Sequence, residues 1–368
     1  MSLFDQDAQE SDAAPEPVSR ARKITSSILF SIFVLAALGV FFLPTPYVIT
    51  RPGPVFNVLG SIDSKPVLNI SGAAVYSTSG ELNLMTVSEL GKPGRTPSWL
   101  EIFSAWVDPA QSVIPLDVAY PPQVSVNQVD TENVTMMTDS RQDATVVALT
   151  KLGYQIPTTM KVGYIAKKSA AEGLLKVDDL IVKIDSLPAT GFAQLTAAVQ
   201  ATEGKKPITL GIERAGKALT VSMTPALIKG ELRIGIFVGY KYSFPIDVSV
   251  NLPDVGGPSG GLMFAMGIYD KLTPGELTGG HSISGTGQID PTGKIGPIGG
   301  IQQKLYGAVA AKSNWFLAPA NNCNEVVGHI PPGLNVIRVS SFDEALHAVQ
   351  VIANNGNTAA LASCTATK

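Results

Sequence analysis

Ser259 is the residue whose neighbours best suit a nucleophile. It lies in the run Gly256-Gly257-Pro258-Ser259-Gly260-Gly261, between a strand-like segment and an apolar helical segment. Glycines allow a sharp turn and the close approach of a substrate backbone, and proline suits the first turn of a helix. Because N–H groups at a helix start are unpaired, those of Gly257 and Ser259 are candidates for an oxyanion hole. Serine is also common at helix starts as a simple cap, so this run alone does not decide for catalysis.

A nucleophilic serine needs a general base. The three histidines have no spacing that recommends any of them, and we interpret all three as surface or packing residues: His281, His329 and His347. A lysine can replace histidine if its surroundings lower its pKa from about 10.4 to about 7–8, a bias of roughly 4 kcal/mol. The helix predicted over 299–312 has Lys304 at the edge of its apolar stripe and Lys312 on that stripe near the helix end. Periodicity does not choose between these two lysines.

Composition excludes several other kinds of chemistry. The 368 residues include 27 basic and 30 acidic side chains, so the net charge of −3 gives no electrostatic basis for binding nucleic acid. Gly293-Lys294 superficially suggests a phosphate-binding loop, but Ile295 replaces the required Ser or Thr, and we predict no nucleotide site. The only two cysteines, Cys323 and Cys364, lack CxxC spacing, which excludes a zinc ribbon. We therefore expect neither a metal nor another cofactor.

Residues 24–43 form an uncharged, largely apolar stretch of 20 residues, which as a helix spans about 30 Å, the thickness of a bilayer core. A cleaved signal peptide has a shorter apolar run, of about 7–15 residues, and a better cleavage site than Leu43-Pro44-Thr45-Pro46. Basic residues at 20, 22 and 23 precede the stretch. The sequence predicts a single transmembrane anchor at the cell membrane, a disordered cytoplasmic tail over 1–23 and an extracytoplasmic remainder. An oxidising exterior would allow Cys323 and Cys364 to pair, although two free thiols remain the alternative.

The first extracytoplasmic part, residues 44–138, contains short β-rich runs and a helix over 97–107. We expect this region to pack on the other domains. Trp99, Phe103 and Trp106 recur at helical spacing, which favours core or interdomain packing over a ligand site.

Residues 139–226 open with a helix over 139–153 and continue as strand, strand, helix and a β-hairpin. This part resembles a bacterial-type PDZ domain through three segments: Ser169-Ala170-Ala171-Glu172-Gly173-Leu174, Asp178-Asp179-Leu180-Ile181 and Ile184-Asp185-Ser186. The family usually has Gly-Asp where this chain has Asp178-Asp179. The resemblance implies capture of an extended peptide or C-terminus by strand addition. Gly153, Tyr154 and Ile156 are the candidate carboxylate-binding loop, and a domain that only packs on its neighbour is the alternative.

Residues 227–352 alternate strands and helices, and residues 353–368 are predicted to be a flexible tail. Three motifs occur in order: Gly257-Pro258-Ser259-Gly260-Gly261, Thr286-Gly287-Gln288-Ile289 and Pro297-Ile298-Gly299-Gly300-Ile301-Gln302-Gln303-Lys304-Leu305. Together they resemble the proteolytic domain of Lon-type serine proteases, which use a Ser–Lys dyad. The resemblance implies that Ser259 is the nucleophile, Lys304 the general base and Thr286 a hydrogen-bond partner of the lysine.

The order of these parts resembles the bacterial membrane-anchored PDZ-domain Lon-like protease family, which lacks an ATPase module. The fold class implied is multidomain α+β, with one transmembrane helix, a PDZ-like domain and a Lon-type α/β domain. The implied function is ATP-independent endopeptidase cleavage of unfolded or flexible extracytoplasmic proteins, and the family resemblance also suggests a hexameric ring. A non-catalytic anchored peptide-binding scaffold and a self-processing device remain the alternatives.

Overall fold

The computed structural model describes residues 20–122, 124–228, 230–253 and 255–365. The chain divides into two compact units. The first unit combines the residues up to Arg51 with Glu89–Val126, and the second combines Pro52–Ser88 with the chain from Asn127 onward. Most of the tail predicted over 1–23 lies outside the described residues.

The first unit is built from one long helix, a short strand pair and two short helices. Its elements are α1 (Arg20–Val40), the start of β1 (Tyr47–Asn57), α2 (Trp99–Val107), β6 (Ser112–Pro115) and α3 (Leu116–Ala119). Nowhere in the described part of the chain is a helix both long and apolar enough to cross a membrane.

Helix α2 buries one face in a small core, while the Phe103 ring contacts Phe41 outside that core. It begins with a capping box between Ser98 and Glu101, and Ile102 lies in a small core with Ile49. Trp99 contacts that core, but Phe103 and Trp106 are 50% and 57% exposed. Core packing, one of the two predicted roles of this stripe, is confirmed for Trp99, and interdomain packing of the other two aromatic residues stays a prediction.

The second unit contains the sheet that carries the predicted proteolytic motifs. Its strands are neighbours in the order β20 (Asn335–Val339), β19 (Trp315–Pro319), β16 (Ser282–Gly285), β5 (Glu81–Leu90) and β1. Strand β16 pairs in parallel with both β19 and β5. The region 44–138 therefore does more than pack on other domains, since its strands complete this sheet. Periodicity could not reveal this, because the paired strands are about 200 residues apart in the chain.

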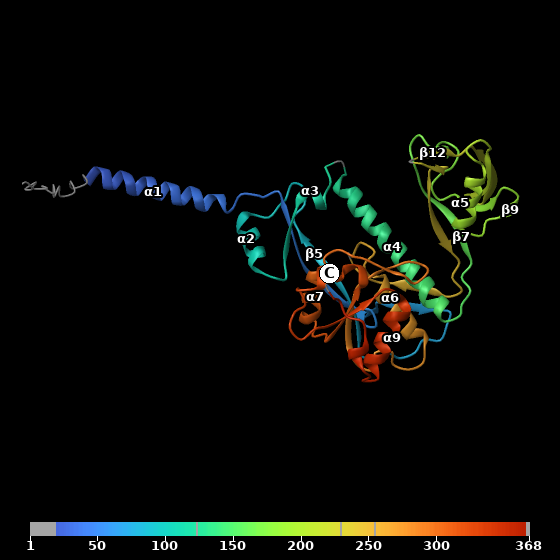
Figure 1. Cartoon of the computed structure of the whole chain (residues 1–368). Helices are drawn as coiled ribbons and strands as arrows, with labels where there is room; N and C mark the ends of the chain where they lie inside the picture. Colours follow the sequence, from blue (N-terminus) through green and yellow to red (C-terminus); the bar gives the residue numbers. More distant parts are fainter. Residues whose placement is uncertain (1–19, 123, 229, 254, 366–368) are drawn as a thin grey trace, which may run out of the picture. The chain divides into compact units, whose positions relative to one another are not determined.

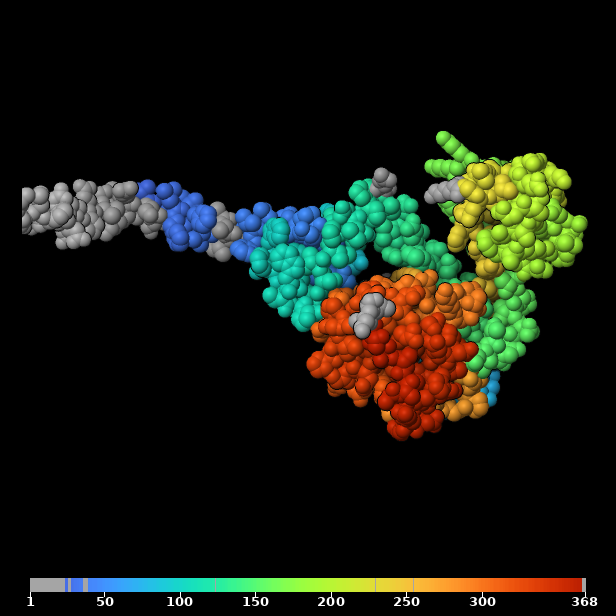
Figure 2. Space-filling view, viewed as in Figure 1, coloured from blue at the N-terminus to red at the C-terminus, as the bar shows by residue number. Residues whose placement is uncertain are grey.

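Three helices of the proteolytic part pack around this sheet: α6 (Gly261–Leu272), α7 (Ile301–Ala310) and α9 (Phe342–Ala353) (Figure 1). The main core joins apolar side chains of β5, α6 and α9, and residues 262–266 of α6 are all fully buried. A second cluster lies around Leu305 of α7 and Phe316 of β19. Figure 2 shows the C-terminal residues, coloured orange to red, gathered in one compact part of the molecule.

Helix α4 (Val126–Lys151) begins 13 residues before the predicted start at residue 139. It packs into the main core through Met137, Ala144, Val147 and Ala148. The apolar residues before Met137 are exposed or only partly buried, so the first half of the helix has no continuous buried face. Because α4 belongs to the proteolytic core, residue 139 is not the start of the PDZ-like domain, as the sequence had suggested.

The short remaining elements are β2 (Ser61–Ile62), β3 (Lys65–Pro66), β4 (Leu68–Ser71), β15 (Asp247–Val250), β17 (Gln288–Ile289), β18 (Ile295–Gly296), η1 (Ala320–Asn322), α8 (Cys323–Val326) and η2 (Thr358–Ala360). Cys323 and Cys364 form a disulfide. The backbone N–H of Arg338 in β20 donates to the Ala362 carbonyl at 2.8 Å. The prediction of a flexible tail is therefore wrong for the described residues 353–365, which a covalent bond and backbone hydrogen bonding hold in place.

The PDZ-like domain, defined here as residues 158–242, has a separate core. Its elements are β7 (Thr158–Ile165), β8 (Leu180–Ile184), β9 (Leu187–Pro188), α5 (Phe192–Ala201), β10 (Ile208–Arg214), β11 (Lys217–Met223), β12 (Ala226–Ile228), β13 (Glu231–Arg233) and β14 (Ile236–Tyr242). The sheet order is β11-β10-β8-β7-β14. Strand β14 pairs with β7, so the predicted boundary at 226/227 is wrong. The domain is an insertion between α4 and β15 of the proteolytic part.

The turn before β8 explains one departure from the PDZ pattern. Asp178 adopts φ +70°, the left-handed conformation for which the family usually supplies glycine. The next residue, Asp179, is 1% exposed and accepts two hydrogen bonds of 2.7 Å from the Arg214 guanidinium. The buried carboxylate is thus fully paired and its role is structural.

Candidate active site

Ser259 lies in a turn immediately before α6. The helix begins at Gly261, so Pro258 lies in the turn of residues 257–260 and not in the first helical turn, the position that its residue type suits. Glycine is needed here for steric reasons: a Cβ on Gly260 would lie 2.7 Å from the Phe264 ring, and one on Gly261 would lie 2.8 Å from Ile289. This packing presents Ser259 half-buried at the helix start.

A cavity of about 380 Å³ borders Ser259. Its other lining residues are mostly apolar or small: Pro54, Phe56, Thr86, Val87, Ser88, Pro253, Val255 and Gly256. The segments 52–57 of β1 and 85–88 of β5 thus reach the nucleophile loop, a proximity that no sequence motif indicated.

Lys304 is 1% exposed on α7, one of the largest buried side chains of the described chain. Burial lowers the pKa of its amine to about 7. Lys312, by contrast, is exposed beyond the end of α7. Periodicity did not show which of the two lysines is the general base. The burial of Lys304 and the exposure of Lys312 favour Lys304.

Thr286 connects Lys304 to the nucleophile loop. It is fully buried just after β16, and its hydroxyl accepts a hydrogen bond of 3.0 Å from Lys304 Nζ. The same hydroxyl donates to the Ser259 carbonyl at 3.1 Å, and the Gly287 N–H donates to that carbonyl at 2.9 Å. Since a hydroxyl has one proton, donation to Ser259 leaves its lone pairs to receive the amine. None of the hydrogen bonds among the residues placed by the structure joins Ser259 Oγ directly to Lys304 Nζ.

The two candidate oxyanion donors differ in availability. The Gly257 N–H already donates to the Asn133 carbonyl of α4 at 2.9 Å. The Ser259 N–H has no hydrogen-bond partner among the residues that are described. Of these two candidates, Ser259 is therefore the one whose N–H is available to a developing oxyanion.

The residues predicted to form a carboxylate-binding loop end a helix instead. Gly153 has φ +87°, and the Tyr154 N–H returns to the Leu149 carbonyl at 3.0 Å. This is the hydrogen-bond pattern with which glycine often terminates helices. Ile156 leads into β7, which is paired on both sides, so strand addition is blocked there. Strand β14 lies at the edge of the sheet. The predicted boundary at 226/227 had placed this strand in the proteolytic domain.

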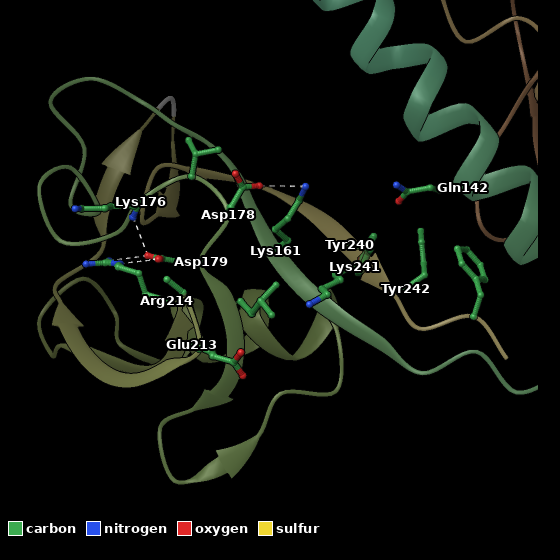
Figure 3. Close-up of a pocket in the computed structure, with 15 residues that line it drawn as sticks. Gln142, Lys161, Lys176, Asp178, Asp179, Glu213, Arg214, Tyr240, Lys241 and Tyr242 are labelled. Atoms are coloured by element: carbon green, nitrogen blue, oxygen red, sulfur yellow. Dashed lines mark hydrogen bonds and ion pairs between the residues drawn. The ribbon is translucent and has the colours of Figure 1, made fainter. Parts of the chain in front are cut away.

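A cavity of about 710 Å³ lies between the PDZ-like domain and α4 (Figure 3). Its charged groups are largely paired with one another: Lys161 with Asp178 at 3.3 Å, and Arg214 with Asp179. It contains no serine, cysteine or histidine. Across the described ranges, no three potential metal ligands from His, Cys, Asp and Glu gather at one place.

Residues 244–351 match the family model of the Lon protease (S16) C-terminal proteolytic domain. This part of the chain is therefore similar to a Lon-type proteolytic domain. Ser259, Thr286 and Lys304 all lie within the matched residues. The match supports a serine peptidase.

The chain is also similar to solved PDZ structures. The PDZ domain of an SdrC-like protein from Listeria innocua is 22% identical, with a TM-score of 0.20, over 22% of this chain and 92% of that chain. That of an SdrC-like protein from Listeria monocytogenes is 18% identical, with a TM-score of 0.21, over 22% of this chain and 85% of that chain. No curated protein matches the chain.

Proposed function

We propose that this protein is an ATP-independent serine endopeptidase in which Ser259 and Lys304 form the catalytic dyad. The observation that carries the proposal is the buried lysine. Its amine has a lowered pKa and is linked through the Thr286 hydroxyl to the backbone of Ser259. A lysine that is largely neutral near pH 7 can accept the proton of a serine hydroxyl.

In the proposed reaction, neutral Lys304 takes the proton of Ser259 Oγ as that oxygen attacks the scissile carbonyl. The developing oxyanion receives a hydrogen bond from the Ser259 N–H. Lys304 then returns the proton to the leaving amine, and an acyl-enzyme forms on Ser259. Lys304 next takes a proton from a water molecule, whose oxygen attacks the ester, and gives that proton to Ser259 Oγ as the acyl–oxygen bond breaks, which releases the acid and restores neutral Lys304; Thr286 keeps the amine oriented. The reaction requires Ser259 Oγ within hydrogen-bond reach of Lys304 Nζ, a contact that often tightens only when substrate binds.

The cavity beside Ser259 suggests the kind of substrate. Phe56, Val87 and Val255 give it an apolar lining. We propose that it receives an apolar side chain next to the scissile bond of a flexible or unfolded protein. We propose that the PDZ-like domain receives an extended peptide along β14, one of the two edge strands of its sheet.

The test is hydrolysis of casein together with labelling of Ser259 by a fluorophosphonate, which reacts with activated serines. Ser259→Ala is expected to abolish both, and Lys304→Ala to reduce both by at least about a hundredfold, in the range of general-base catalysis. Lys312→Ala is the matched control, because it removes an exposed lysine at the end of the same helix. Retained hydrolysis in Ser259→Ala and Lys304→Ala would refute the dyad. Peptide binding without hydrolysis would favour the scaffold, and self-cleavage without turnover the self-processing device.

Membrane anchoring through residues 24–43, an extracytoplasmic catalytic domain and assembly into a hexameric ring stay proposals. Carbonate extraction of membranes tests the anchor, and protease accessibility in intact cells tests the side on which the domain lies. Analytical ultracentrifugation of the full chain in detergent tests the ring.

A further inference from the structure

Helix α4 contacts the loop that carries Ser259 at two points on one helix face. The Ser140 hydroxyl, on a side chain that is 3% exposed, donates to the Pro258 carbonyl at 2.9 Å. The Asn133 carbonyl, two helical turns earlier, accepts the Gly257 N–H at 2.9 Å. These two contacts fix the orientation of the Gly256–Gly257 and Pro258–Ser259 peptide units, with the Gly257–Pro258 unit between them.

The contact from Ser140 determines where the Ser259 N–H points. The Pro258 carbonyl and the Ser259 N–H belong to the same peptide unit, and in a trans peptide these two groups point in opposite directions. Every peptide bond of the described chain is trans. With its carbonyl turned to α4, this peptide unit must direct the Ser259 N–H away from α4, where it has no partner.

We infer that Ser140 is a positioning residue for catalysis, which orients the Pro258–Ser259 peptide so that the Ser259 N–H is available to the oxyanion. The next peptide unit is held independently, because the Ser259 carbonyl accepts from Thr286 and Gly287. Both peptide units that flank the nucleophile are therefore fixed, one by α4 and one by the segment after β16.

The packing leaves the loop little room to relax toward α4. A Cβ on Gly256 would lie 2.9 Å from the Asn133 Cβ, and one on Gly261 would lie 2.9 Å from the Ser140 Oγ. Removing the Ser140 hydroxyl leaves the Pro258 carbonyl with the long contact of 3.5 Å from the Gly261 N–H, while most of this packing stays. The peptide unit can then rotate and turn the Ser259 N–H away from the oxyanion.

The inference rests on the proposed peptidase function, and its test compares Ser140→Ala with Thr145→Ala. Thr145 is a matched control: its side chain is 4% exposed on the same helix, and its hydroxyl bonds only within α4, to the Arg141 carbonyl. The measurements are kcat and KM on an unfolded substrate, the fluorophosphonate labelling rate, its pH profile and Tm. Removal of one oxyanion donor costs about 10²–10³ in kcat, so a misdirected donor is expected to cost about 10- to 100-fold.

For Ser140→Ala we expect kcat and the labelling rate to fall by that factor, with KM and the pH midpoint unchanged because Lys304 is untouched. Thr145→Ala is expected to keep the wild-type rate. Ser140→Cys, which is nearly isosteric with a weaker donor, should fall between wild type and Ser140→Ala, and it replaces that variant if Ser140→Ala does not fold.

Wild-type kcat in Ser140→Ala would overturn the inference while leaving the proposed function intact. So would an equal loss in Thr145→Ala accompanied by an equal fall in Tm, because the effect would then be one of folding. A wild-type chain that neither cleaves nor labels would overturn the proposed function and this inference together.

Discussion

Lowering the pH below about 7 is expected to stop the acylation of Ser259, because Lys304 then holds a proton and cannot act as a base. Burial moves the pKa of this amine from 10.5 to about 7. At about 1.4 kcal/mol per pH unit, that shift corresponds to roughly 5 kcal/mol of bias against the charged amine.

The size of the effect follows from the neutral fraction of the amine. At pH 7.5 an ordinary lysine is neutral in about one molecule in a thousand, whereas a lysine with a pKa near 7 is neutral in about three quarters of molecules. Burial of Lys304 therefore raises the population of competent base several hundredfold near neutral pH. Below the midpoint, the acylation rate should fall about tenfold per pH unit.

The assay is the rate of fluorophosphonate labelling of Ser259 between pH 5 and 9, with Lys312→Ala as the control for general effects of charge. A rate that rises with unit slope and levels off above about pH 7 is expected in both chains. A rate that stays flat down to pH 5, or that keeps rising with unit slope beyond pH 9, would refute the reasoning that burial prepares Lys304 as the base.

Three further predictions concern the same body of the protein. Lys304→Met should raise the free energy of unfolding at pH 7 by up to about 4 kcal/mol, because the unfolded lysine binds a proton that burial disfavours in the folded protein. This gain is largest below pH 7 and disappears as the pH approaches 10.5. Urea denaturation at several pH values measures it. Thr286→Val should lower kcat about tenfold or more while Thr286→Ser largely restores it, because only the hydroxyl can accept from Lys304 and donate to Ser259; equal kcat in both variants would contradict this role. Replacing Cys323 and Cys364 together by alanine should lower the free energy of unfolding by up to about 4 kcal/mol, the loop-entropy value for a bridge across 41 residues, and an unchanged Tm would contradict it.

Local sequence features determined much of the fold correctly. The strands β7 and β8, the helix α5 and the hairpin of β10 and β11 follow in the predicted order, and α7 lies within two residues of the helix predicted over 299–312. Each of these elements has its own apolar periodicity and turn residues, so the signal lies within the segment itself.

The sequence could not determine how distant segments join. It divided the chain at residues 139 and 227, whereas α4 packs in the proteolytic core and β14 pairs with β7. Pairing between strands depends on which edges meet in three dimensions, and a single strand carries no record of its partner.

For the site, the sequence determined which residue types were available, and the order of three motifs singled out Ser259, Thr286 and Lys304. Only the tertiary structure separated the buried Lys304 from the exposed Lys312 and revealed the contacts of α4 with the nucleophile loop. The physical reason is that a pKa and the direction of an N–H group depend on what surrounds them. Those surroundings are assembled from segments that are far apart in the chain.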